Sequence, residues 1–167
     1  ASLPIRNGGL GIRKVEDIAL PAYLSSVMSV KSLVNIILHI NSDDVIVTDY
    51  AAAEEKWIDY GLEMAVLKAF QKSWDNIKIG KIVSELDFHD LKDKARFLAS
   101  SKPESSMWLT ALPSRNLGTM LDNNTFRISS ALRLGTNICK PHPCVCGKMV
   151  EDDGTHGLSC VKSAGRF

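Results

Sequence analysis

Three cysteines and one histidine lie close together near the C-terminal end of the sequence. Cys144, Cys146, His156 and Cys160 form the pattern C-x-C-x9-H-x3-C within seventeen residues. Zn²⁺ takes four thiolate or imidazole donors at about 2.0 to 2.3 Å in a tetrahedron. A set of three cysteines and one histidine leaves no coordination position open. We therefore predict a structural zinc site rather than a catalytic one.

The residues between these ligands suit a small metal-bound module, or knuckle. Gly147 lets the chain turn after the first pair, and the Asp-Asp-Gly sequence at 152–154 is a second turn. His156 and Cys160 are separated by about one helical turn. Such a module buries little apolar surface, so zinc should supply most of its folding free energy. Removal of the metal should loosen the tail and leave the helical remainder folded.

Other interpretations of these cysteines stay open from the sequence alone. The C-x-C pair is tighter than the commoner C-x₂-C, and Cys139 or His142, just upstream, could replace one ligand. Without metal, the thiols would be reduced core cysteines beside an incidental histidine. A disulfide framework is disfavoured, because nothing in the sequence points to an oxidising compartment.

No catalytic constellation accompanies the cysteines. Ser159 lacks the second glycine of a nucleophile elbow. The acids at 151–153 are consecutive, so they point in different directions and indicate a solvated turn. No phosphate-binding G-x-x-x-x-G-K-[ST] motif is present, and the glycines at 8–11 lack the spacing of a dinucleotide loop. We therefore expect no enzymatic activity, no catalytic residues and no small-molecule substrate.

The composition is that of a folded globular chain. Hydrophobic residues make up 45% and charged residues 23% of the 167 residues. The net charge of +1 and the pI of about 7.9 offer no strong attraction to a phosphate backbone. From Pro113 onward, seven basic residues stand against four acidic ones. This mild bias is typical of an ordinary solvated surface.

Apolar positions recur at helical steps along most of the chain. We predict helices over 22–39, 51–58, 63–74, 77–86 and 87–100, a short one through Trp108 that ends before Pro113, and one from Asp122 or Asn123 to Leu134, ended by Gly135. The polar residues 41–44 form a break, and the apolar run 45–48 is too short to indicate a sheet. Trp57 and Trp74 are assigned to the core rather than to base stacking, as is Trp108.

These observations predict a mostly α fold, an irregular multi-helix domain over 1–135 followed by a zinc-knuckle tail over 136–167. The apolar stretch 27–40 contains too many polar residues for the about 20 apolar residues of a membrane span, so we predict a core helix there. No secretory signal opens the sequence, which favours a nuclear or cytoplasmic protein. The sequence begins without Met, and we expect a fragment of a longer protein.

Several segments of the sequence resemble a known family. They are Leu3-Pro-Ile-Arg-Asn-Gly-Gly-Leu-Gly-Ile-Arg13, Trp108-Leu-Thr-Ala-Leu-Pro113, Phe126-Arg-Ile128 with Leu132-Arg-Leu-Gly135, and the run from His156 to Arg166. Together they resemble the reverse-transcriptase-like polyproteins of non-LTR retrotransposons. The Gly-Gly-Leu-Gly-Ile segment is similar to the stretch where the thumb begins after the polymerase palm. The cysteine–histidine cluster resembles the knuckle that precedes a restriction-like endonuclease domain.

The resemblance also indicates what this chain lacks. The polymerase signature Tyr-x-Asp-Asp is absent, and neither Asp43-Asp44 nor Asp152-Asp153 matches it. The carboxylates and lysine of the nuclease would lie beyond Phe167. The resemblance therefore implies a non-catalytic thumb or linker plus a CCHC zinc knuckle, from a parent polyprotein that is an RNA-directed DNA polymerase.

Two functions from different classes follow. The first is binding of template RNA or target DNA by the helical body and the knuckle, with salt-sensitive phosphate contacts. The candidate contacts are Arg127, Arg133, Lys148, Lys162 and Arg166. The second is a helical protein-interaction domain in which zinc is purely structural. A non-functional relic of a decayed element is a third possibility. No membrane partner is expected.

Overall fold

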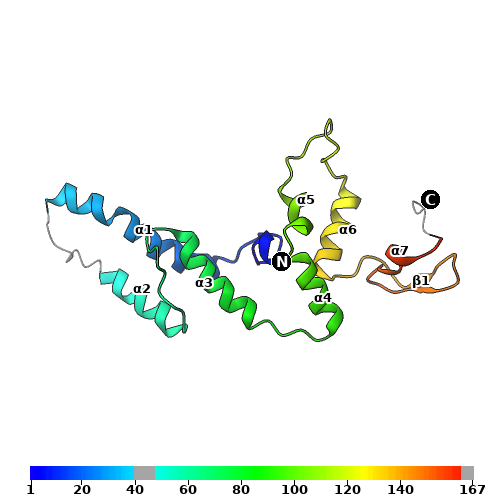
Figure 1. Ribbon diagram of the computed structural model, residues 1–167, viewed down its shortest axis with the longest axis horizontal. Helices are drawn as coiled ribbons and strands as arrows, with labels where there is room; N and C mark the ends of the chain where they lie inside the picture. Colours follow the sequence, from blue (N-terminus) through cyan, green and yellow to red (C-terminus); the bar gives the residue numbers. More distant parts are fainter. Residues whose placement is uncertain (40–47, 163–167) are drawn as a thin grey trace. The chain divides into compact units, whose positions relative to one another are not determined.

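The computed structural model describes residues 1–39 and 48–162, and within them the chain is largely helical (Figure 1). The elements are η1 (Ile5–Asn7), α1 (Val15–Leu38), α2 (Thr48–Asp59), α3 (Gln71–Ser84), α4 (Leu91–Ser100), η2 (Glu104–Ser106), α5 (Met107–Thr110), α6 (Asn123–Leu134), β1 (His142–Pro143), β2 (Met149–Val150) and α7 (His156–Ser159). The predicted fold class, mostly α with a small cysteine–histidine tail, is confirmed. The predicted polar break at 41–44 and the apolar run that follows lie outside the described residues.

The chain divides into two compact units. Unit 2 is Arg13–Asp87, and unit 1 combines Ala1–Ile12 with the described residues from Phe88 onward. The boundary at residue 135 that we predicted from the sequence does not coincide with this division. The tail after that residue belongs to unit 1, where it shares a pocket with side chains of α6.

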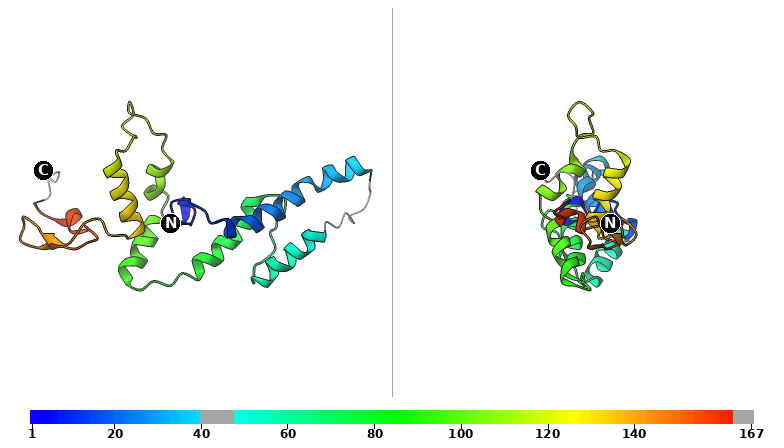
Figure 2. Two further views of the ribbon diagram at one scale, coloured as in Figure 1. Left: turned by 180° about the vertical axis from the view of Figure 1, so that it is seen from behind. Right: turned by 90° about the vertical axis from the view of Figure 1, so that its right-hand side faces the viewer.

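Two tryptophans form the centre of unit 2. Trp57 on α2 and Trp74 on α3 are fully buried, and their rings meet edge to face with centroids 5.0 Å apart. Leu24 of α1 packs against them, as do Leu62 and Ala65 from the loop between α2 and α3. Within this unit α1 runs beside α3 and also contacts α2 (Figure 2). The prediction that these two tryptophans are core residues is confirmed.

The loop between α2 and α3 replaces most of the helix that the sequence predicted over 63–74. The indole N–H of Trp57 donates to the carbonyl oxygen of Glu63 at 2.9 Å, and that of Trp74 donates to Lys68 at 2.8 Å. Each buried indole thus obtains the hydrogen-bond partner that it requires from loop backbone. These two bonds fix the loop against the core, so the prediction of a helix there was wrong.

α1 begins at Val15, earlier than the predicted start at residue 22, and continues through Pro21. A proline inside a helix lacks the N–H donor and costs about 3 kcal/mol. The Pro21 ring is fully buried, and its burial offsets part of this cost. Glu16 and Asp17 lie in the first turn, where negative charge is favourable.

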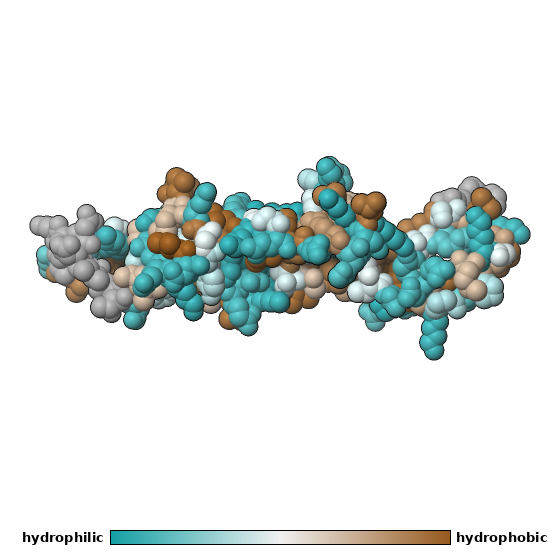
Figure 3. Space-filling view, turned by 90° about the horizontal axis from the view of Figure 1, so that it is seen from below, coloured by the Kyte–Doolittle hydropathy of each residue, from teal (hydrophilic) through white to brown (hydrophobic). Residues whose placement is uncertain are grey.

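The C-terminal half of α1 is largely exposed, so the prediction of a core helix over 27–40 was wrong. Leu33, Ile36 and Ile37 are each more than half exposed, and the buried residues of α1 all lie in its N-terminal half. By length and composition alone, α1 is long and apolar enough to cross a membrane, although one such helix is weak evidence of a span. Apolar patches also reach the surface elsewhere, among hydrophilic side chains (Figure 3).

A buried guanidinium joins the segments of unit 1. Arg133 on α6 is only 6% exposed. Its Nε donates to the carbonyl of Gly9 at 3.0 Å, and its Nη1 to that of Ser105 at 3.0 Å. Its Nη2 donates to the carbonyl of Ile5 at 2.6 Å and to Oγ of Ser106 at 3.1 Å. The N-terminal loop, η2 and α6 are thereby connected through one side chain.

Two glycines permit this close packing. A Cβ on Gly9 would overlap the backbone of Leu3, and a Cβ on Gly135 would overlap the guanidinium of Arg96. That guanidinium donates to the carbonyl of Arg133 at 2.8 Å. Gly135 has a left-handed φ of 70° and ends α6, as predicted.

Aspartates begin the two long helices of unit 1. Asp122 accepts from the N–H of Thr125 at 3.1 Å, which confirms the predicted start of α6. Asp90 accepts from the N–H of Asp93 at 2.6 Å, so α4 begins later than predicted. The carboxylate of Asp90 thus caps the helix.

Replacement of a core tryptophan should unfold unit 2 selectively. We expect Trp74→Ala to lower the free energy of unfolding by about 3 to 5 kcal/mol, because it leaves a cavity against Trp57. The control is Phe70→Ala, since Phe70 is 62% exposed and its loss should cost about 0.5 kcal/mol. Urea unfolding followed by tryptophan fluorescence measures both variants, and equal losses would contradict the assignment.

Candidate metal centre

A short hairpin carries the first two cysteines. β1 and β2 pair antiparallel, with His142 opposite Val150. In the loop between them, the N–H of Cys144 donates to the carbonyl of Lys148 at 2.8 Å, and the N–H of Gly147 donates to the carbonyl of Cys144 at 2.8 Å. Gly147 has a left-handed φ of 86°, which confirms the turn predicted there. Both cysteines therefore lie on one tight loop.

A single helical turn carries the other two candidate ligands. The turn at 152–154 leads into α7, and His156 is the first residue of this helix. Cys160 follows directly after the helix and is buried. A separation of four residues places both side chains on one face of the turn. The sequence prediction of one helical turn between them is confirmed.

The four side chains converge on one point. The donor atoms of Cys144, Cys146, His156 and Cys160 all lie within 4.8 Å of one another. The sulfurs of Cys144 and Cys160 are 3.7 Å apart, and the sulfur of Cys146 is 3.3 Å from Nε2 of His156. A zinc tetrahedron with the usual bond lengths separates two sulfurs by about 3.8 Å and a sulfur from a nitrogen by about 3.5 Å. The donor set therefore fits a Zn²⁺ ion.

Hydrogen bonds from backbone amides change the pKa values of two of the thiols. The N–H of Lys148 donates to the sulfur of Cys146, and with the neighbouring thiols and His156 it lowers the pKa of Cys146 to about 7. At Cys160 the N–H of Lys162 lowers the pKa, but burial and the neighbouring thiols outweigh it, so that the pKa is raised. Three thiols so close together cannot all ionise easily unless a cation lies between them. The electrostatics of the cluster thus also favour a bound metal ion.

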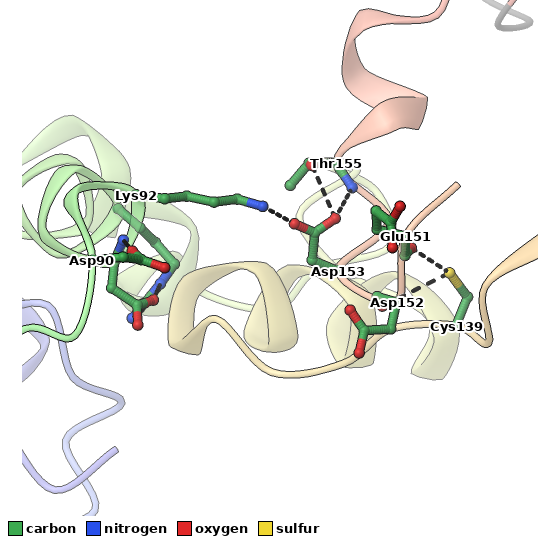
Figure 4. A network of polar contacts seen from close by, with 9 residues as sticks. Asp90, Lys92, Cys139, Glu151, Asp152, Asp153 and Thr155 are labelled. Atoms are coloured by element: carbon green, nitrogen blue, oxygen red, sulfur yellow. Dashed lines mark hydrogen bonds and ion pairs between the residues drawn. The ribbon is translucent and has the colours of Figure 1, made fainter. Parts of the chain in front are cut away.

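Cys139 and His142 lie outside this cluster. The thiol of Cys139 is directed at backbone carbonyls of the turn, and donates to that of Glu151 at 3.4 Å (Figure 4). Nδ1 of His142 is 2.8 Å from the carbonyl of Lys140. The four convergent donors already complete a tetrahedron. The alternative in which one of these two residues replaces a ligand is therefore not supported.

An ion pair fastens the turn before α7 to the helical part of unit 1. Lys92 on α4 pairs with the carboxylate of Asp153 (Figure 4). The same carboxylate accepts from the N–H and the hydroxyl of Thr155, both at 2.9 Å. The Lys92 ammonium, followed by the bonds from Thr155, lowers the pKa of Asp153 to about 2. The sequence predicted only a solvated turn there, because no local pattern links residues 61 positions apart.

The predicted nucleic-acid contacts separate into two groups. Lys148, Lys162 and Arg127 are exposed. The ammonium of Lys162 lies 3.5 Å from the carbonyl of Val145. Arg133 is buried on four neutral oxygens, and it is therefore unable to contact a phosphate. Its prediction as a contact was wrong, because the helical pattern does not show that its guanidinium faces inward. Arg166 lies outside the described residues.

Comparisons with known proteins add no relatives to this picture: no protein-family model matches the chain, and no curated protein or solved structure matches it either. The geometry of the metal centre and of its surroundings is therefore the basis for a functional interpretation.

Loss of the first cysteine pair should abolish metal binding. We expect the wild-type chain to carry one zinc ion, and the double variant Cys144→Ser, Cys146→Ser to carry none, because two of the four donors are removed. Cys139→Ser is the matched control and should retain the ion. Native mass spectrometry of reduced protein measures the metal content. Zinc retained in the double variant would overturn the assignment.

Substitution of Arg133 should destabilise unit 1 instead of weakening a surface contact. We expect Arg133→Met to lower the free energy of unfolding by about 3 kcal/mol, because several buried carbonyls lose their charged donor. The exposed Arg127 provides the control, and Arg127→Met should change stability by about 0.5 kcal/mol or less. Hydrogen exchange of the backbone amides of α6 measures the loss of stability in each variant relative to the wild type. Wild-type protection of α6 in Arg133→Met would refute this role.

Proposed function

We propose that this chain is a non-catalytic nucleic-acid-binding segment whose zinc ion is structural. Its ligand would be the phosphate backbone of template RNA or target DNA. The observation that carries the proposal is the position of two exposed lysines on the cysteine–histidine cluster. Lys148 and Lys162 each stand two residues after a candidate ligand, and each directs its backbone N–H toward that sulfur.

A bound zinc ion would supply a cross-link between the hairpin and α7. Cys144 and Cys146 would hold it from the hairpin, and His156 and Cys160 from the helical turn. Because the backbone of both lysines is bonded to the cluster, their ammonium groups would project from rigid loops. Lysines on a rigid loop lose less conformational entropy when they contact phosphate. Such contacts position a nucleic acid without reading its sequence.

The absence of catalysis is part of the proposal. Three thiolates and an imidazole fill a tetrahedral site, so that no position remains for a water molecule or a substrate. The resemblance of the sequence to reverse-transcriptase-like polyproteins of non-LTR retrotransposons supports the same interpretation. In that family the segment would be the thumb or linker with its CCHC knuckle, and the parent polyprotein would copy RNA into DNA. Such a segment would act in the nucleus or the cytoplasm.

A second function, a protein-interaction domain with a purely structural zinc site, has its own support. The C-terminal half of α1 exposes Leu33, Ile36 and Ile37 along one helix. Exposed apolar surface of this kind is typical of protein contacts. The near-neutral net charge of +1 also gives no general attraction to nucleic acid. The two functions differ in whether binding to a nucleic acid depends on the lysines of the cluster.

Nucleic-acid binding should depend on salt and on the two lysines. We expect the zinc-loaded chain to bind a single-stranded oligonucleotide at low salt, and affinity to fall as salt rises. The double variant Lys148→Gln, Lys162→Gln should bind more weakly, with the slope of log K against log salt reduced by about 0.7 for each phosphate that a lysine no longer neutralises. Fluorescence anisotropy over a salt series measures both.

The matched control removes two exposed lysines from unit 2. Lys56→Gln with Lys72→Gln makes the same change in net charge, but leaves the cluster intact. If affinity falls by the same factor in both double variants, binding depends on the net charge of the chain and not on the lysines at the metal centre. If the wild-type chain does not bind at low salt, the proposal fails and the protein-interaction function is favoured.

A further inference from the structure

A pocket of about 420 Å³ lies between α6 and the tail, beside the metal centre. Its walls are mostly apolar, with Ile128 and Leu132 from α6, Ile138 from the connecting segment, and Val150 and Leu158 from the tail. The candidate ligands Cys144, His156 and Cys160 form part of the same wall. A volume of this size is within the range of small-ligand sites. The pocket belongs wholly to unit 1.

The charged residues that line the pocket indicate what kind of ligand it would bind. Lys162 is the one lysine or arginine among the residues that line it, and no aspartate or glutamate lines it. The exposed imidazole of His142 also lines the pocket. A negatively charged ligand is therefore favoured at the rim, and an apolar group is favoured inside. A strand of nucleic acid has this pair of properties, since its phosphates are charged and the faces of its bases are apolar.

We propose that this pocket receives one unpaired nucleobase, while the phosphate next to that base contacts Lys162. The inference rests on the proposed function and adds to it a preference for single-stranded over fully paired nucleic acid. An unpaired base has an exposed face, which stacks on apolar side chains whatever its identity. Gly157 lines the pocket without a side chain of its own, and a Cβ built there would meet open space.

Gly157 allows the pocket to be filled without a clash. A Cβ built there meets no other heavy atom within 4 Å, and Gly157 lies in α7 without a left-handed φ. Because Gly157 lines the pocket and its Cβ would meet open space, Gly157→Phe should add a ring at the pocket and leave the zinc ligands in place. Gly80→Phe is the matched control, because Gly80 lies on α3 in unit 2 and its Cβ would also meet no atom.

The experiment compares two oligonucleotides of equal length and charge, one with bases and one abasic along its whole length. For the wild-type, zinc-loaded chain we expect about tenfold tighter binding of the oligonucleotide with bases, within the range for stacking of one base. Gly157→Phe should remove this difference and leave the affinity for the abasic strand unchanged. Gly80→Phe should preserve the difference. Metal content, measured in parallel, verifies that each variant keeps its zinc.

A second variant tests the pocket independently, so that the proposal can still be checked if Gly157→Phe does not fold. Leu158 is 62% exposed at the pocket, so that Leu158→Ala should leave the fold intact and reduce the base-dependent difference severalfold. If the wild-type chain binds both strands equally, or if both pocket variants keep the tenfold difference, the pocket does not hold a base. In either case salt-dependent binding of the abasic strand would still support the proposed function. Failure to bind either strand would overturn both proposals.

Discussion

The buried guanidinium of Arg133 is the contact on which unit 1 depends. Arginine has five N–H donors in a rigid fork, and here four of its bonds reach the N-terminal loop and η2. The acceptors are neutral, and desolvation lowers the pKa of Arg133. The guanidinium stays charged even so, because an arginine side chain is not deprotonated in proteins. Around this contact Gly9 lies close to Leu3 and Gly135 close to Arg96, where a Cβ on either glycine would overlap its neighbour.

The tail is held in a different way. Its two strands are two residues long and α7 is a single turn, so that it has little apolar surface to bury. An external contact compensates in part: the Lys92–Asp153 ion pair. A zinc ion at the four donors would add a cross-link within the tail. This combination explains why the tail belongs to unit 1 and yet keeps a loop geometry suited to a metal.

Local signals in the sequence predicted the structure well, and distant contacts escaped prediction. The cap at Asp122 and the end of α6 at Gly135 act within a few residues, and both are confirmed. The cysteine–histidine pattern spans seventeen residues, and the predicted convergence of its four side chains is confirmed. The failures have non-local causes. The buried indoles bond to loop carbonyls in place of a helix over 63–74. The burial of Arg133 depends on backbone more than a hundred residues away, which periodicity does not encode.

Unit 1 is discontinuous, because the whole of unit 2 lies in the sequence between its two segments. The bond from Arg133 to Gly9 joins positions 124 residues apart. Closing so long a loop costs conformational entropy, and contacts of high sequence separation form slowly. On the ribosome the N-terminal loop must wait until α6 has emerged, whereas unit 2 is complete much earlier. Early folding of unit 2 would shorten the effective loop, so this inserted unit would assist the closure of the unit whose two sequence segments flank it.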